Sequence, residues 1–254
     1  MKHIRWALSP HVFLVLPLAL AACGDERASP EDYDDIAVAL SALSVDEGGD
    51  AESVIDAAEI ALGEADLSSE GEGRFDGVRG GIAYAYAVDC FNARDVPLDT
   101  CDSRTRRAEI DVAIDGVLST QRRRGTLDRD GRWTLSVAPD LGSVTLDGEV
   151  SSDVASSFEA LRRDEERSLN IRVRGIYQSI VFDRTSQEIV GGRIVLTLSA
   201  QRMRSSAFVE VEASFDVEAT IEFSADALPL LTLDGERRYE IVDQRPVPMP
   251  PEAN

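Results

Sequence analysis

Few residues in this chain could carry acid–base, nucleophilic or metal chemistry. The two histidines, His3 and His11, and the single lysine, Lys2, all lie within the first eleven residues. Beyond them the sequence offers carboxylates, arginines, tyrosines, hydroxyls and cysteines. Without histidine or lysine, a chain has no Ser-His-Asp triad, no His-ligated metal site and no Schiff-base lysine. We therefore expect no catalytic residue, no metal site and no cofactor if this first segment is removed.

Carboxylates alone can hydrolyse glycosides when two of them face each other across a cleft. The chain has 47 Asp and Glu, so chance pairs are unavoidable and their number points to no site. Aromatic residues, which would stack on sugars in such a cleft, make up only 6% of the chain. We expect a non-catalytic protein, with a carboxylate-based hydrolase as a remote alternative.

Residues 1–22 have the order of an export signal. A short basic start, Met1–Arg5, precedes an apolar stretch that is interrupted by two prolines and is too short for a comfortable membrane span. The stretch ends in Leu20-Ala21-Ala22-Cys23, which resembles the lipobox of bacterial lipoproteins. That motif has an apolar residue, two small residues and then the modified cysteine. The alternative is an ordinary export signal that happens to contain a cysteine.

The resemblance implies cleavage before Cys23, a thioether-linked diacylglycerol on its sulfur and acylation, for example by palmitate, of the new amine. Several acyl chains together anchor a protein stably, whereas a single chain does not. Gly24 follows the cysteine, and by the sorting rule of enteric bacteria this residue permits transport to the outer membrane. The expected location is the bacterial cell envelope, on the outer membrane in preference to the inner one.

The two remaining cysteines, Cys90 and Cys101, form an even pair in a chain with an export signal, which predicts a disulfide. Closing a loop of this size stabilises a fold by about 3 kcal/mol on the chain-entropy model. The alternative is a redox-active pair. That alternative has little support, because the sequence lacks CxxC spacing and a nearby lysine or histidine that would lower a thiol pKa.

The charge balance limits the partners. The formal net charge is −21, and it becomes more negative when Lys2 and Arg5 are removed with the signal. Nucleic acids and anionic lipid surfaces both require a basic footprint, so neither is an expected partner. The expected partners are the membrane, through Cys23, and either another envelope protein or an apolar ligand.

Acidic residues concentrate in a segment with helical periodicity. Residues 24–72 contain 16 Asp and Glu and only one arginine. Apolar residues recur at helical spacing on both sides of Gly48-Gly49, which predicts helices at about 32–44 and 51–65, arranged as an acidic hairpin within residues 31–67. The simpler account of the acid is a solvated face on weakly packed helices. The other account is a spacer that binds divalent ions or repels the membrane surface.

From Gly80 onward the periodicity changes to two, which predicts strands. Apolar and polar residues alternate, and the strand candidates are 82–88, 110–114, 133–137, 144–150, 169–173, 194–198 (after Gly191-Gly192) and 209–224. In the first of them large residues alternate with Ala83, Ala85 and Ala87, which suits a strand that is buried on both faces. The last is long enough to require a bend or bulge in a large curved sheet. Arginines at spacing of two would lie opposite acidic rows as cross-strand pairs.

Five segments have turn, connecting or tail character. Asp128–Gly131 reads as a hairpin turn, and the Ser-rich stretch 151–168 reads as a long connection. Thr-Leu-Asp-Gly-Glu occurs at 145–149 and again at 232–236, which suggests a duplicated hairpin. Residues 245–254 form a Pro-rich tail that we expect to be extended and mobile.

The predicted fold is therefore mostly β. One large curved antiparallel sheet, sandwich or half-barrel of about 8–10 strands spans residues 78–244, after a lipidated cysteine and tether at 23–30 and the helical hairpin. The function remains unknown from sequence. The leading hypothesis is a lipid-anchored envelope protein with a structural or protein-interaction role. The alternative is a carrier of lipid or another apolar molecule within the sheet, as periplasmic lipoprotein carriers and their receptors combine a half-open barrel with covering helices. That comparison is an architectural analogy only.

Overall fold

The computed structural model describes residues 28–45, 49–65, 69–71, 73–119, 123–159, 166–205, 210–243 and 245–250. The expected signal peptide, Cys23 and residues 24–27 of the tether lie outside these residues. None of the helices in the described part is long and apolar enough to cross a membrane.

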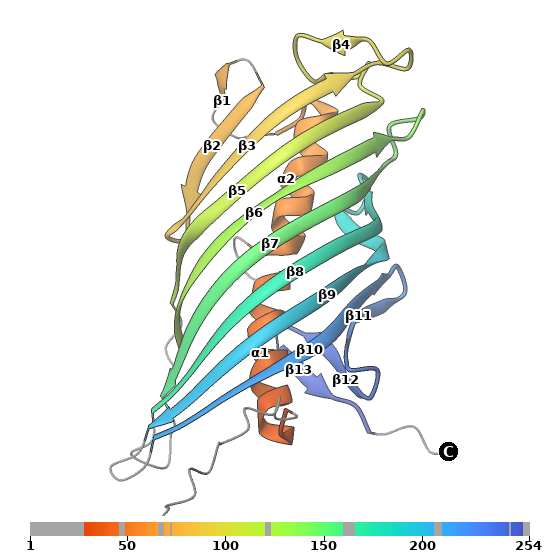
Figure 1. Ribbon diagram of the computed structural model, residues 1–254. Coiled ribbons are helices and arrows are strands. Elements are labelled where there is room, and N and C mark those ends of the chain that lie inside the picture. The colour runs from red at the N-terminus through yellow and green to blue at the C-terminus, as the bar shows by residue number, and fades with distance from the viewer. Residues whose placement is uncertain are drawn as a thin grey trace, which may run out of the picture.

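A single antiparallel sheet makes up most of the fold, as predicted (Figure 1). Each strand pairs with the next one along the chain, except that β3 pairs with both β5 and the short β4. The strands in the described residues are β1 (Ser69–Gly71), β2 (Arg74–Arg79), β3 (Ile82–Phe91), β4 (Pro97–Leu98), β5 (Arg107–Ser119), β6 (Arg123–Val137), β7 (Ser143–Glu159), β8 (Glu166–Asp183), β9 (Glu188–Ser205), β10 (Glu210–Ser224), β11 (Ala227–Leu233), β12 (Arg237–Val242) and β13 (Arg245–Pro248).

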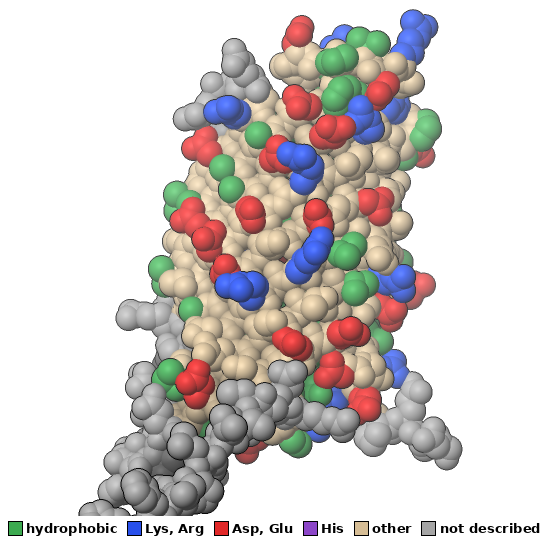
Figure 2. All heavy atoms as spheres, in the orientation of Figure 1, with side chains coloured by type: hydrophobic (Ala, Val, Ile, Leu, Met, Phe, Trp, Pro, Cys, Tyr) green, Lys and Arg blue, Asp and Glu red, His purple; other side chains and the backbone are tan. Residues whose placement is uncertain are grey.

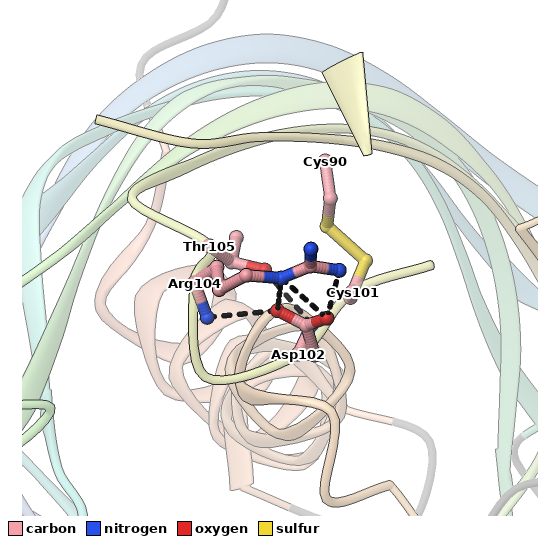
Figure 3. Close-up of a disulfide and its surroundings, with 5 residues drawn as sticks. All are labelled: Cys90, Cys101, Asp102, Arg104 and Thr105. Atoms are coloured by element: carbon pink, nitrogen blue, oxygen red, sulfur yellow. Dashed lines mark hydrogen bonds and ion pairs between the residues drawn. A yellow bond between two sulfur atoms is a disulfide. The ribbon is translucent and has the colours of Figure 1, made fainter. Parts of the chain in front are cut away.

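The sheet curls but does not close, since β1 and β13 stand at its two ends. Figure 3 shows it arching around a helix that is seen nearly end-on. The strands are long, up to 18 residues in β8 and β9, and their right-handed twist bends such a sheet. Register shifts in β7–β8, β8–β9 and β10–β11 add local bends. We call this open, curved sheet the half-barrel.

The two predicted helices, α1 (Pro30–Val45) and α2 (Asp50–Leu62), line the concave face of the half-barrel. They follow one another along the sheet and do not pack side by side (Figure 1). α1 contacts β11, β12 and β13, whereas α2 contacts β5, β6, β8 and β9. Ser29 and Asp32 cap the start of α1 reciprocally, each donating its backbone N–H to the other's side chain. α2 ends at Gly63, in the left-handed conformation typical of a C-terminal cap.

The core lies between these helices and the inward side chains of the strands. Small residues on the helices, among them Ala37, Ala57 and Ala61, are fully buried and allow the helix backbones to approach the sheet closely. The account of weakly packed, solvated helices is therefore wrong for the face that meets the sheet. The opposite face of the sheet carries intermixed acidic and basic side chains, with apolar side chains scattered singly among them (Figure 2).

The alternation predicted for the long strands is confirmed. Ile110, Trp133, Ile171, Leu198 and Val217 point inward and are buried, while their sequence neighbours are exposed. The predicted cross-strand ion pairs also form on the outer face. They are Arg132–Asp111, Arg172–Asp153 and Arg174–Glu149.

The strand β3 is buried on one face only, contrary to the prediction. Ile82, Tyr86 and Val88 face the core, but Ala85 and Ala87 are exposed on the outer face. The small side chains therefore leave no internal space. An alanine row on an outer face looks the same in the sequence as an alanine row against a close-packed neighbour.

Three segments expected to be turns, connections or tail belong to strands. Asp128–Gly131 lies in the middle of β6, where Arg129 faces inward. The stretch 151–168 is mostly the end of β7 and the start of β8, leaving only residues 160–165 between them. Residues 245–248 of the Pro-rich tail form β13, an edge strand, where proline is tolerated because one side of the backbone needs no partner.

Candidate functional site

The predicted disulfide is present, between Cys90 at the end of β3 and Cys101, with a sulfur–sulfur distance of 2.01 Å (Figure 3). A compact turn follows it. The backbone N–H of Asp102 donates to Thr105 Oγ1 at 3.0 Å, and Arg104 forms an ion pair with Asp102 at 2.6 Å. The left-handed Gly63 packs against this turn, since a Cβ there would lie 2.7 Å from the carbonyl oxygen of Cys101. The disulfide loop therefore covers the C-terminal end of α2, which is a structural role.

A buried polar cluster fastens the start of α2 to the sheet. Arg129 Nη1 lies 2.8 Å from Asp50 Oδ1, and both side chains are at least nine-tenths buried. The Tyr177 hydroxyl donates to the same carboxylate, and Arg129 Nε donates to Ser152 Oγ at 3.1 Å. Burial, together with the Asp50 charge, raises the pKa of Tyr177 well above its usual value, so its hydroxyl stays protonated and remains a donor.

A second cluster holds the middle of α2. Arg79 contacts both Asp56 oxygens at 3.1 Å and Glu52 at 2.8 Å, and the Tyr86 hydroxyl donates to Asp56 at 3.0 Å. Burial raises the pKa of Asp56 despite the opposing effects of Arg79 and Tyr86. The Arg79 guanidinium also lies 4.8 Å from the centre of the Tyr84 ring, a cation–π arrangement. This cluster therefore joins α2 to β2 and β3.

A third cluster holds α1. Arg202 forms a hydrogen-bonded ion pair with the buried Asp32, and Arg204 contacts Glu31 at 2.8 Å. Although burial raises the pKa of Asp32, hydrogen bonds from Ser29 and the Arg202 interaction outweigh it, so the net pKa is lowered.

Two tyrosines form further hydrogen bonds between α1 and the sheet. Tyr239 on β12 donates to Asp34 at 2.9 Å, and Tyr33 on the helix donates to Asp234 at 2.6 Å. The Asp234 hydrogen bond, with some burial, raises the pKa of Tyr33 to about 12. These carboxylates of the helices are thus used for docking to the sheet.

The sequence reasoning missed these clusters, although one signal was available. Arg129 lies at the same alternating positions of its strand as the inward-facing Leu127 and Trp133. Arg202 continues the inward row of Ile194 to Ala200. A charged residue in phase with an apolar row predicts a buried partner of opposite charge. In these clusters the carboxylates are paired with arginine or accept hydrogen bonds from tyrosine.

Two cavities of the described residues lie between α2 and the concave face of the sheet. A cavity of about 10 Å³, lined by Leu40, Asp50, Arg129, Ser152 and Tyr177 among others, lies between the helices and the sheet. Such a volume holds one water molecule at most. The second cavity, of about 500 Å³, lies at the C-terminal end of α2 beside the disulfide loop, and is lined by Ile60, Phe75, Val88, Cys90 and Leu98 among others.

A larger open groove lies at the edge of the helix–sheet contact. It has a volume of about 600 Å³ and separates the start of α2 from the hairpin tips between β8 and β9 and between β10 and β11. We call it the rim groove. Its walls are Ala51, Ile55, Gln187, Glu188, Ile189, Val190, Phe223, Ser224, Ala225, Asp226, Ala227, Leu228 and Pro229.

Comparison with known proteins gives no assignment. No protein-family model, no curated protein and no solved structure matches this chain. The remaining predicted site residue, Cys23, lies outside the described residues, so its acylation stays a prediction.

Proposed function

We propose that this chain is a bacterial envelope lipoprotein, anchored in the outer membrane by acyl chains on Cys23, with a non-catalytic domain that engages another envelope component. The observation that carries the non-catalytic part is the use of the helix carboxylates. Asp32, Asp50 and Asp56 are each paired with arginine and lie against the sheet. This arrangement supports a rigid scaffold better than a hydrolase.

The close packing of the helices on the middle of the concave face, where the cavity is only about 10 Å³, supports the same interpretation over a carrier that holds its cargo there. Cargo there would have to displace α1 and α2, and with them three sets of buried ionic and hydrogen-bonded contacts. Removing one partner of a buried ion pair typically costs about 3–5 kcal/mol. Displacement of the whole helical segment is therefore expensive without a strongly bound ligand.

The proposed anchor also orients the domain. Four residues separate Cys23 from Ala28, where the described structure begins, and the five steps between these two residues reach at most about 18 Å. The two consecutive helices extend the structure by about 40 Å from that point. The disulfide loop, at the far end of α2, would then face away from the membrane and be the part best placed to meet a partner.

Fractionation of cells tests the anchor. The wild-type protein should stay with membranes after a high-salt wash, whereas a Cys23→Ala variant should be released. A Cys90→Ser/Cys101→Ser variant is the control, because it alters cysteines without touching the proposed acylation site. A Cys23→Ala variant that remains in the washed membranes would contradict the anchor.

Photo-crosslinking on intact cells tests the partner role. A crosslinker at Val96, which is 51% exposed in the disulfide loop, should join the protein to a discrete partner. A crosslinker at Val38, 41% exposed on α1 near the proposed membrane end, is the matched control.

Native mass spectrometry of the chain 24–254, which contains every described residue, tests the carrier alternative. A co-purifying lipid mass that is lost on denaturation would favour the carrier and weigh against the scaffold.

A further inference from the structure

The rim groove combines an apolar floor with open access. Ile55 on α2, Ile189 on β9 and Phe223 on β10 are partly buried and pack against the core, and Leu228 remains 49% exposed. A volume of about 600 Å³ falls in the range of small-molecule sites. The groove is open at the edge of the helix–sheet contact, so a ligand could enter it without moving either helix.

A backbone irregularity accompanies the groove. The register shifts in β8 between Gln178 and Val181, where it pairs with β9, and Gly192 on β9 has a φ of 98°. A Cβ at Gly192 would lie 2.3 Å from the carbonyl oxygen of Ser179, so only glycine fits there. The backbone N–H of Ser179, itself at positive φ, donates to Asp147 Oδ1 at 2.8 Å.

This irregularity explains the Gly191-Gly192 pair in the sequence. Bulges bend a strand and are frequent beside functional sites. Residues 187–190, which come directly before the bend on β9, form one wall of the groove. The bend is thus placed where it sets the position of that wall relative to α2.

The charges at the groove are of one sign. Glu188 and Asp226 line it, and none of its lining residues is an arginine. Within the described part of the chain, neither carboxylate forms an ion pair. The net charge of the whole protein, −21, adds to the negative potential. A ligand with a positive end is attracted to such a groove, and an anionic amphiphile is repelled.

We propose that the rim groove binds a cationic amphiphile, a molecule with one aliphatic chain that ends in an ammonium or amine group. The chain would lie against Ile55, Phe223 and Leu228, and the cation would lie beside Glu188 and Asp226. This site does not depend on the lipid anchor or on the protein partner proposed above, and it is tested without either.

Isothermal titration of the chain 24–254 with decyltrimethylammonium and with decyl sulfate, both below the concentration at which micelles form, tests the proposal. We expect one cationic ligand per protein, bound about tenfold or more tightly than the sulfate of equal chain length. Leu228→Asn should weaken binding of the cation, while Val96→Asn, at an equally exposed valine in the disulfide loop, should not. Glu188→Gln/Asp226→Asn should remove the preference for the cation.

Four results would overturn the proposal. The first is no binding of the cationic probe, and the second is equal or tighter binding of decyl sulfate. The third is an equal loss of affinity in the Leu228 and Val96 variants, which would indicate general adsorption. Binding of a basic amphipathic peptide in place of the small cation would also overturn it, in favour of a protein ligand. Unfolding midpoints of all variants exclude misfolding as the cause of a loss.

Discussion

Removal of one partner from the ion pair between Arg129 and Asp50 should strongly destabilise the fold. Only 2% of the Arg129 side chain and 8% of the Asp50 side chain are exposed. Replacing Arg129 with Met keeps most of the side-chain volume but leaves a buried carboxylate with the Tyr177 hydroxyl as its main partner. Loss of one partner of a buried pair costs about 3–5 kcal/mol, and we expect the free energy of unfolding to fall by that amount at pH 7.

The same strand provides a matched control. Arg132 lies three residues further along β6, on the outer face, and its ion pair with Asp111 at 2.6 Å is open to solvent, with 74% and 59% of the two side chains exposed. Exposed pairs contribute about 0–1 kcal/mol, so Arg132→Met should have little effect. Urea unfolding followed by circular dichroism measures both variants under identical conditions.

A double-mutant cycle separates the pair from other losses. Asp50→Leu alone leaves a buried arginine without its carboxylate, and the double variant Arg129→Met/Asp50→Leu leaves no buried charge. We expect the double variant to be destabilised by at least about 2 kcal/mol less than the sum of the two single variants. Additive effects, or a cost for Arg129→Met no larger than that for Arg132→Met, would refute the argument that this pair fastens α2 to the sheet.

Three further predictions use the same urea assay. Cys90→Ser/Cys101→Ser should lose about 3 kcal/mol, and a reductant should lower the wild-type midpoint equally but leave the variant unchanged. Gly192→Ala should lower the free energy of unfolding by more than about 1 kcal/mol, because of its positive φ and the contact of a Cβ with Ser179. Gly191→Ala should be nearly neutral, because a Cβ there meets nothing nearer than 3.8 Å. Equal effects of the two substitutions would contradict the assigned bend. Because burial raises the pKa of Asp56, the folded protein keeps this proton to a higher pH than the unfolded chain does, so the contribution of Asp56 to stability falls as the pH rises above about 4. Asp56→Asn should remove that fall between pH 4 and 7, while Asp111→Asn on the outer face should leave it unchanged.

The long strands and the helices were predictable because each buries one face, and burial of one face imposes a period on the sequence. Trp133 to Val137 and Ala213 to Ile221 show that period without interruption. The short strands β1, β4 and β13 were not predictable, because two to four residues are too few to show alternation. These short strands form because their backbones hydrogen-bond to a longer neighbouring strand.

Local sequence also fails to predict the structure where the same five residues adopt two different conformations. Thr-Leu-Asp-Gly-Glu at 145–149 lies within β7 at a register shift, whereas at 232–236 it ends β11 and turns toward β12. In the first copy, pairing with β6 and β8 on both sides keeps the backbone extended. In the second, Asp234 and Gly235 both adopt positive φ, as a tight hairpin requires. The long-range partners decide between the two, and one copy alone does not reveal them.

The buried clusters were hidden for a related reason. Asp50 and Tyr177 are 127 residues apart, and Tyr239 and Asp34 are 205 apart, so no local pattern connects them. Arg129 was assigned to a turn because Asp128-Arg129-Asp130-Gly131 contains turn-forming residues. The parity of Arg129 relative to Leu127 and Trp133 was the better guide, because an inward phase is imposed by the core.

The chain-ordered pairing of the strands has a consequence for how the protein folds. Each hairpin can close as soon as its second strand is available, so the sheet can grow in the order in which the chain emerges. The helices emerge first, yet their partners extend from Arg79 to Tyr239, and α1 must wait for nearly the whole chain. Because long-range contacts form slowly, docking of the acidic helices should be the last and slowest step of folding. Until then the concave face is an exposed apolar surface, and in that interval the protein is most exposed to aggregation.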